Sequence, residues 1–246
     1  MKKNAVKIIR IISILVLIFS LAWLGVFYFK ENREKLSIEA YRELKGASAE
    51  GSGEMLDEYK ALYAENPDTV GWLRIEGTDI DYVVMQNKAE PEKYLHLDFF
   101  GSYSRRGCLF VGEGCDVAKS DNILIYGHHM KDGSMFGHLV DYQSKDFYKE
   151  HQYISFDTLY EKRTYQVVAA INTKIPPEEK DCFRYWECVG ENDEEMFSQY
   201  LSFIDENKLY DTGTEIESGD KLLTLSTCAY HTKDGRFILV AKLVED

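Results

Sequence analysis

Clustered positive charge is what this sequence most clearly lacks. Its 246 residues include 42 acidic and 29 basic side chains, for a formal net charge of −13. Five of the basic residues lie within the first 30 positions, which hold no acidic residue, so the remainder of the chain is more acidic still. Binding to nucleic acid needs Lys and Arg gathered against phosphates. We therefore expect no nucleic acid as a partner.

The spacing typical of metal sites is also missing. The five cysteines stand at positions 108, 115, 182, 188 and 228. Neither near pair, 108 with 115 or 182 with 188, has the gap of about two to four residues usual in zinc sites. We expect no metal and no cofactor. Each near pair could be a disulfide or two free thiols, which leaves Cys228 as the unpaired cysteine.

Charge is absent from Ile11 to Phe29. A helix of this length spans roughly 28 Å, close to the thickness of a membrane's hydrocarbon core. The basic residues before it predict a cytoplasmic N-terminus and an extracellular body in a single-pass protein of the cell membrane. A cleaved signal peptide is the competing interpretation, but no small-x-small site directly follows the run. The expected domains are a tail and anchor at 1–30, a helical spacer at 31–66 and a catalytic domain at 67–246.

Beyond the anchor, short apolar segments alternate with turn residues, and no internal repeat is apparent. Two helices are expected first, at about 33–45 and 54–65, and a third late in the chain, at 193–206. This pattern predicts a mainly β fold, either a barrel or a sandwich. The strands are expected at residues 71–75, 81–85, 107–111, 122–126, 153–156, 164–171, 221–225 and 236–244.

One pair of strands carries the clearest chemical signal. The block Thr-Leu-Ser-Thr-Cys at 224–228 follows an apolar strand, and Arg236 begins the next strand after a short polar loop. Strands joined by so short a loop are expected to form a hairpin, with Cys228 beside Arg236. A fixed positive charge next to a thiol favours the reactive thiolate. Arginine also offers a fork of donors to a developing negative oxygen.

A cysteine nucleophile needs a proton acceptor, and three of the six histidines are candidates. His128 follows the predicted strand 122–126 in a glycine turn. His129 is adjacent but is expected to point to the opposite side of an extended chain. His231 lies in the hairpin loop, three residues after Cys228. The histidines at positions 96, 138 and 151 are interpreted as surface or capping residues.

These residues together resemble a known family. The Tyr-Gly-His sequence at 126–128, the block at 224–228 and the following Arg236 are similar to those of the sortases, membrane-anchored cysteine transpeptidases of Gram-positive bacteria. The Gly-His-His-Met-Lys sequence at 127–131, the Gly-Ser-Met-Phe-Gly sequence at 133–137, the helical N-terminal extension and the late helix resemble class B. The resemblance covers about residues 54–246. It implies an eight-stranded β-barrel with a helix between strands six and seven.

The resemblance also implies site residues and a reaction. Cys228 would be the nucleophile, His128 the acid and base, and Arg236 the donor to the oxyanion, with Ser226 and Thr227 in the substrate groove. The thiolate would cleave a C-terminal sorting motif of a secreted protein at its Thr–Gly or analogous bond. An amine of a cell-wall precursor or a pilin would then resolve the thioacyl intermediate. The chain departs from some class B members, which carry acidic residues where Ala229 and Tyr230 stand here.

Two other functions remain open. A papain-like cysteine protease would need its cysteine early and its histidine late, with a helix after the cysteine. Here that order is reversed. A non-catalytic, membrane-tethered extracellular β domain that binds a partner is the second alternative, and it would carry an inert Cys228.

Overall fold

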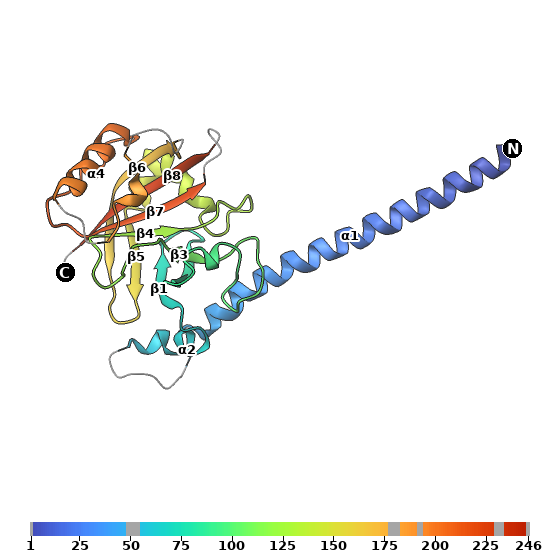
Figure 1. The fold of residues 1–246 in the computed structure, drawn as a ribbon, viewed down its shortest axis with the longest axis horizontal. Coiled ribbons are helices and arrows are strands. Elements are labelled where there is room, and N and C mark those ends of the chain that lie inside the picture. The colour runs from blue at the N-terminus through green and yellow to red at the C-terminus, as the bar shows by residue number, and fades with distance from the viewer. Residues whose placement is uncertain (1, 48–54, 177–182, 191–193, 229–233, 245–246) are drawn as a thin grey trace. The chain divides into compact units, whose positions relative to one another are not determined.

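The structure, a computed structural model, describes residues 2–47, 55–176, 183–190, 194–228 and 234–244, with the backbone alone for residues 2–6, 8 and 9. The chain divides into two compact units, Met1–Ala40 and Tyr41–Asp246. The first consists of one helix, and the second contains every strand (Figure 1).

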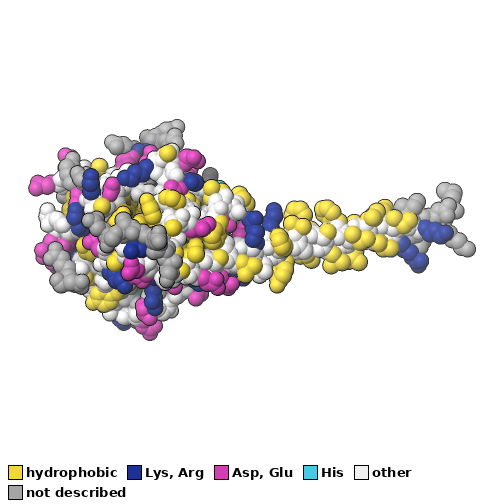
Figure 2. All heavy atoms as spheres, turned by 90° about the horizontal axis from the view of Figure 1, so that it is seen from below, with side chains coloured by type: hydrophobic (Ala, Val, Ile, Leu, Met, Phe, Trp, Pro, Cys, Tyr) yellow, Lys and Arg dark blue, Asp and Glu magenta, His cyan; other side chains and the backbone are white. Residues whose placement is uncertain are grey.

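The described residues of the N-terminal unit all belong to α1 (Lys2–Leu44), whose last four residues fall in the second unit. Its large apolar side chains between Ile11 and Phe29 are 50–73% exposed, and Figure 2 shows them along the length of the helix. Among the described residues, Arg10–Leu44 is long and apolar enough to cross a membrane, which is consistent with a membrane anchor. The helix expected at 33–45 is not a separate element but the end of α1. Helix-forming Glu, Lys, Leu and Ala continue through this segment without a breaker.

The second unit is a closed barrel in the strand order β1-β2-β3-β4-β7-β8-β6-β5. Two neighbouring pairs, β2 with β3 and β4 with β7, run parallel, and the others run antiparallel. The strands are β1 (Thr69–Arg74), β2 (Asp81–Met85), β3 (Leu109–Val111), β4 (Asn122–Tyr126), β5 (Tyr153–Thr158), β6 (Thr164–Lys174), β7 (Leu222–Cys228) and β8 (Gly235–Leu243).

The helices of this unit are short, and all but α2, which precedes β1, lie between strands. α4 (Glu194–Asn207) lies between β6 and β7 and buries Phe197, Tyr200 and Ile204 at helical spacing. The fold class is thereby confirmed, including the late helix and the barrel rather than the sandwich. The remaining elements are α2 (Asp57–Glu65), η1 (Lys93–Leu95), η2 (Gly137–Gln143), α3 (Lys145–Glu150) and η3 (Tyr185–Glu187).

The predicted elements differ from the observed ones mainly at their ends. β2 and β4 have the predicted bounds, whereas β7 continues three residues past the predicted end at 225. The extension is polar, yet Ser226 and Thr227 are buried because β4 and β8 flank β7 on both sides. The segment 137–150 forms η2 and α3, which the sequence did not predict. Each is too short to show a clear helical period.

Candidate active site

Three neighbouring strands bring the predicted cysteine, histidine and arginine to one end of the barrel. β4 and β7 run parallel, with Tyr126 opposite Ser226. β7 and β8 run antiparallel, with Cys228 opposite Arg236, as the predicted hairpin requires. His128 lies two residues beyond Tyr126 and Cys228 lies two beyond Ser226. The register of this part of the sheet therefore sets the histidine and the arginine on either side of the cysteine.

His128, Cys228 and Arg236 all line one cavity of about 540 Å³. Cys228 and Arg236 are each partly exposed, so a molecule in the cavity can reach the thiol and the guanidinium. The wall is largely apolar and aromatic, with two carboxylates among its residues. Further lining residues are Glu92, Leu95, Phe110, Glu113, Tyr126, Ile175, Tyr185, Trp186, Ser226 and Thr227.

His128 is held by the segment that contains η1. Its Nε2 lies 2.8 Å from the carbonyl oxygen of Leu95. Because a carbonyl oxygen only accepts, Nε2 carries the proton and Nδ1 is the nitrogen left for proton exchange in the neutral ring. The His96 ring stacks on His128, with centroids 5.8 Å apart and planes at 22°. His96 is itself exposed, as the sequence indicated for a surface residue, and its ring lies against His128.

His129 and His231 were the other two candidates for the base. His129 donates from Nδ1 to the carbonyl oxygen of Cys228 at 3.0 Å. Its ring therefore contacts the cysteine's backbone, and among the described residues His128 is the histidine that lines the cavity. His231 lies outside the described residues, as do Ala229 and Tyr230.

Ser226 and Thr227 line the cavity, but their hydroxyls have partners within the protein. The oxygens of Ser226 and Tyr185 are 2.9 Å apart, and both residues are buried. Thr227 Oγ1 donates to the Gly127 carbonyl at 2.7 Å, which ties β7 to the turn before His128. Burial raises the pKa of Tyr185, although the Ser226 hydrogen bond and the Arg236 charge offset part of this effect.

The other described cysteines are buried and free, so Cys108 and Cys115 do not form a disulfide. Burial raises the pKa of all three thiols, to about 12 for Cys188. They are therefore protonated at neutral pH and shielded from reagents. Cys182, and with it the second possible pair, lies outside the described residues.

The chemistry available here is that of a thiol, an imidazole and a guanidinium around an apolar cavity. Such a set suits nucleophilic attack on a carbonyl, with proton transfer by the imidazole and charge stabilisation by the guanidinium. Within the described residues, no group of three or more His, Cys, Asp or Glu side chains could hold a metal ion.

A profile of the sortase domain matches residues 73–244, which include all three of these residues. The chain belongs to the sortase family. Sortases are cysteine transpeptidases. Membership in this family therefore argues against the two alternatives left open by the sequence, a papain-like protease and a non-catalytic binding domain.

Its relatives are class B sortases. Sortase B of Staphylococcus aureus is 29% identical over 250 residues, covering 99% of this chain and 98% of the relative. Sortase B of Listeria monocytogenes is 31% identical over 241 residues, covering 92% and 95%. A crystal structure of sortase B from B. anthracis in complex with AAEK1 has a TM-score of 0.76 and 29% identity, covering 89% of this sortase and all of that chain. A Staphylococcus aureus sortase B–substrate complex has a TM-score of 0.74, 27% identity and coverage of 88% and 99%.

Two residues that contact His128 have no signal in the sequence. Leu95 and His96 contact His128 from more than 30 positions away, and no local pattern signals that approach. The sequence does carry a signal for Tyr185 and Trp186, which line the cavity from the irregular stretch between β6 and α4. A long segment with aromatic residues and little regular structure is a weak signal for such a wall, because binding loops often have this character.

Proposed function

We propose that this sortase cleaves the C-terminal sorting motif of secreted proteins at a Thr–Gly or analogous bond and transfers them through a thioacyl intermediate on Cys228. The observation that carries the proposal is the pairing of Cys228 with Arg236 across β7 and β8, beside His128 in one cavity. An apolar cavity of this size suits an extended peptide of a few residues. One of the solved relatives is a complex of sortase B with its substrate, which supports a substrate site here.

The first step forms the thioacyl bond. The Cys228 thiolate attacks the threonine carbonyl, and the C–N bond to the next residue breaks. Nδ1 of His128 gives its proton to the departing amine, while the Leu95 carbonyl keeps the proton on Nε2. Arg236 binds the oxygen that becomes negative as the carbonyl carbon turns tetrahedral.

The second step reverses the proton transfer. An amine from a cell-wall precursor or a pilin attacks the thioester, and His128 takes up the proton that the amine releases. The C–S bond breaks and the thiolate is restored, so the cycle needs no cofactor. We assign Ser226 and Thr227 to the substrate groove, where their backbone and Cβ atoms would face the peptide because their hydroxyls are engaged within the protein.

The same proposal includes the cellular arrangement. The apolar helix would anchor the protein with its N-terminus in the cytoplasm and its catalytic domain outside, where secreted substrates and wall precursors are found. Five basic residues and no acidic ones within the first 30 positions support this orientation. The domains would be the tail and anchor at 1–30, a helical spacer at 31–66 and the catalytic barrel at 67–246.

Intact-mass spectrometry tests the reaction. The full-length protein in detergent micelles is mixed with a panel of peptides that carry Asn-Pro-x-Thr-like and Pro-x-Thr-Gly motifs. We expect one peptide to add the mass of its fragment ending in threonine, and hydroxylamine to release it. The Cys228→Ala variant should stay unmodified. If no peptide adds mass and Cys228 reacts slowly with iodoacetamide, the proposal is wrong.

A further inference from the structure

The carbonyl that holds His128 belongs to a weak element. η1 is a single turn of three residues, and so short a 3₁₀ helix is not stable by itself. Even so, it supplies the Leu95 carbonyl that bonds Nε2 of His128, and the next residue, His96, supplies the stacked ring. The position of His128 therefore depends on whatever fixes η1.

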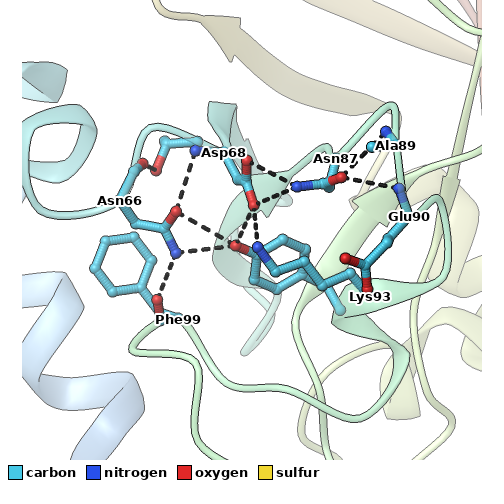
Figure 3. Close-up of polar contacts among 9 residues, drawn as sticks. Asn66, Asp68, Asn87, Ala89, Glu90, Lys93 and Phe99 are labelled. Atoms are coloured by element: carbon cyan, nitrogen blue, oxygen red, sulfur yellow. Dashed lines mark hydrogen bonds and ion pairs between the residues drawn. The ribbon is translucent and has the colours of Figure 1, made fainter.

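A polar cluster fixes η1 to the start of β1 (Figure 3). Asp68, one residue before β1, accepts from Lys93 Nζ at 2.7 Å and from the Tyr94 hydroxyl at 2.8 Å. Asn87 Nδ2 donates to both oxygens of the same carboxylate, at 3.0 and 3.2 Å. Two of the three residues of η1 thus bind a single side chain. The third is Leu95.

Asn66 extends the cluster on its other side. Its Nδ2 donates to the Tyr94 hydroxyl at 3.0 Å and to the Phe99 carbonyl at 2.7 Å. The Tyr94 side chain is 1% exposed, and its backbone carbonyl accepts from Cys108 N at 3.0 Å. Tyr94 is therefore held at both its hydroxyl and its backbone, directly before the residue that contacts His128.

We propose that Asp68, acting through Lys93 and Tyr94, is a positioning residue that holds the Leu95 carbonyl against His128 and so keeps Nδ1 of His128 free to exchange protons with the substrate amine. This inference rests on the proposed function for the role of His128. It adds residues that lie outside the cavity wall and touch neither the cysteine nor the arginine.

The charge of Asp68 is constant near neutral pH, so its contacts with η1 do not depend on pH there. Partial burial alone would raise the pKa of Asp68, but hydrogen bonds from Lys93, Asn87 and Tyr94 outweigh it and hold the pKa below its ordinary value. Asp68 is therefore ionised throughout the neutral range, and the contact with η1 is not switched by pH near 7.

The test compares Asp68→Asn and Tyr94→Phe with the parent, each as the full-length protein in detergent micelles. Tyr94→Phe keeps the packing of the ring and removes only the hydroxyl that joins Asn66 and Asp68. The matched control is Asp121→Asn, which breaks another ion pair, with Lys221 at 2.6 Å, near the start of β4 and away from η1. Four quantities are measured: the imidazole N–H resonances of His128, kcat, KM and the melting temperature.

In the parent, we expect a slowly exchanging Nε2–H resonance from His128, because a hydrogen bond to a carbonyl protects that proton from water. Both cluster variants should lose it. Their kcat should fall roughly tenfold, the effect of about one supporting hydrogen bond on a barrier, while KM changes less than about twofold. Asp121→Asn should keep both the resonance and kcat, even where it lowers the melting temperature.

The resonance separates failure of this inference from failure of the proposed function. If both cluster variants keep the parent's Nε2–H resonance, Asp68 does not position His128, whatever the peptide assay gives. If the variants lose the resonance while the parent cleaves no peptide, the positioning role stands and the proposed reaction is wrong. The inference is also overturned if the variants keep the resonance and lose kcat only in proportion to the fall in their melting temperature.

Discussion

At the scale of single residues, the hydroxyl groups of Ser226 and Tyr185 link β7, the strand that carries Cys228, to η3. The two oxygens are 2.9 Å apart, and Ser226 is fully buried. In such a pair, removing one hydroxyl leaves the other without its partner and away from water, which costs more than removing both. The pair therefore affects both the stability of the barrel and the shape of the groove.

A double-mutant cycle measures this coupling. We expect Ser226→Ala and Tyr185→Phe each to lower the free energy of unfolding by about 1–3 kcal/mol. The double variant should lose clearly less than the sum of the two, because no hydroxyl is left unpaired. Urea unfolding of the four proteins gives the coupling energy. Strict additivity would mean that the two hydroxyls do not stabilise each other.

Arg236 gives a second prediction at this scale. Arg236→Ala should lower kcat by roughly 10²–10³, the loss typical of one oxyanion donor, with little change in melting temperature. Arg236→Lys keeps the charge but not the planar fork, so we expect it to recover only part of the rate. Lys242→Ala, which removes a cation from the same strand β8, is the control and should keep the parent's kcat. Full activity in Arg236→Ala would rule out the assigned role.

The residues that could be predicted from the sequence are those with local signals. Cys228 and Arg236 stand at the ends of two strands joined by a short loop, so their contact follows from chain connectivity. His96 had no such signal, because its stacking on His128 depends on how the segment before β3 returns to the end of β4. Asp68 was missed for the same reason, since its partner Lys93 is 25 residues away.

At the scale of elements, apolar runs predicted where the strands lie, but the ends of the strands depend on the neighbouring strands in the barrel. β4 ended where its apolar run ends, at Tyr126, whereas β7 continued through Ser226 and Thr227 to Cys228. The parallel pairing of β4 with β7 joins segments about 100 residues apart and leaves no local mark in the sequence. This pairing brings His128 towards Cys228 and could not be predicted from the sequence, whereas the pairing of Cys228 with Arg236 across the hairpin could.

The turn after β4 provides a prediction for this scale. A Cβ on Gly127 would lie 2.5 Å from Leu109 Cδ2 and 2.6 Å from Phe136 Cδ2, closer than packed carbons allow. We expect Gly127→Ala to cost about 1–3 kcal/mol and to lower kcat, because the strain falls next to His128. Adding Leu109→Ala removes one of the two clashes, so the double variant should lose less than the sum of the single losses. An additive result in urea unfolding would contradict the clash.

For the whole molecule, the fold brings a buried cation, Arg106, against a carboxylate in the segment that follows His128. Arg106 is 1% exposed and donates from Nη1 to both oxygens of Asp132, at 2.8 and 3.0 Å, within the segment that follows His128. Partial burial alone would raise the pKa of Asp132, but Ser134 and Arg106 outweigh it and hold the pKa below its ordinary value of 3.8. The pKa of Asp68 is shifted in the same direction.

Acid should therefore destabilise the folded barrel through these two groups. Each has a lower pKa folded than unfolded, so its contribution is complete above about pH 4 and is lost as the pH falls through the folded-state value. Asp132→Asn removes one such contribution. We expect this variant to be less stable than the parent at about pH 7, and the difference to shrink as the pH falls below about 4 towards the folded-state pKa of Asp132. Urea unfolding of both proteins across this range measures the effect. A difference that stays constant from neutral to acid pH would mean that the ionised form of Asp132 does not stabilise the fold, and that Arg106 is held by its other contacts.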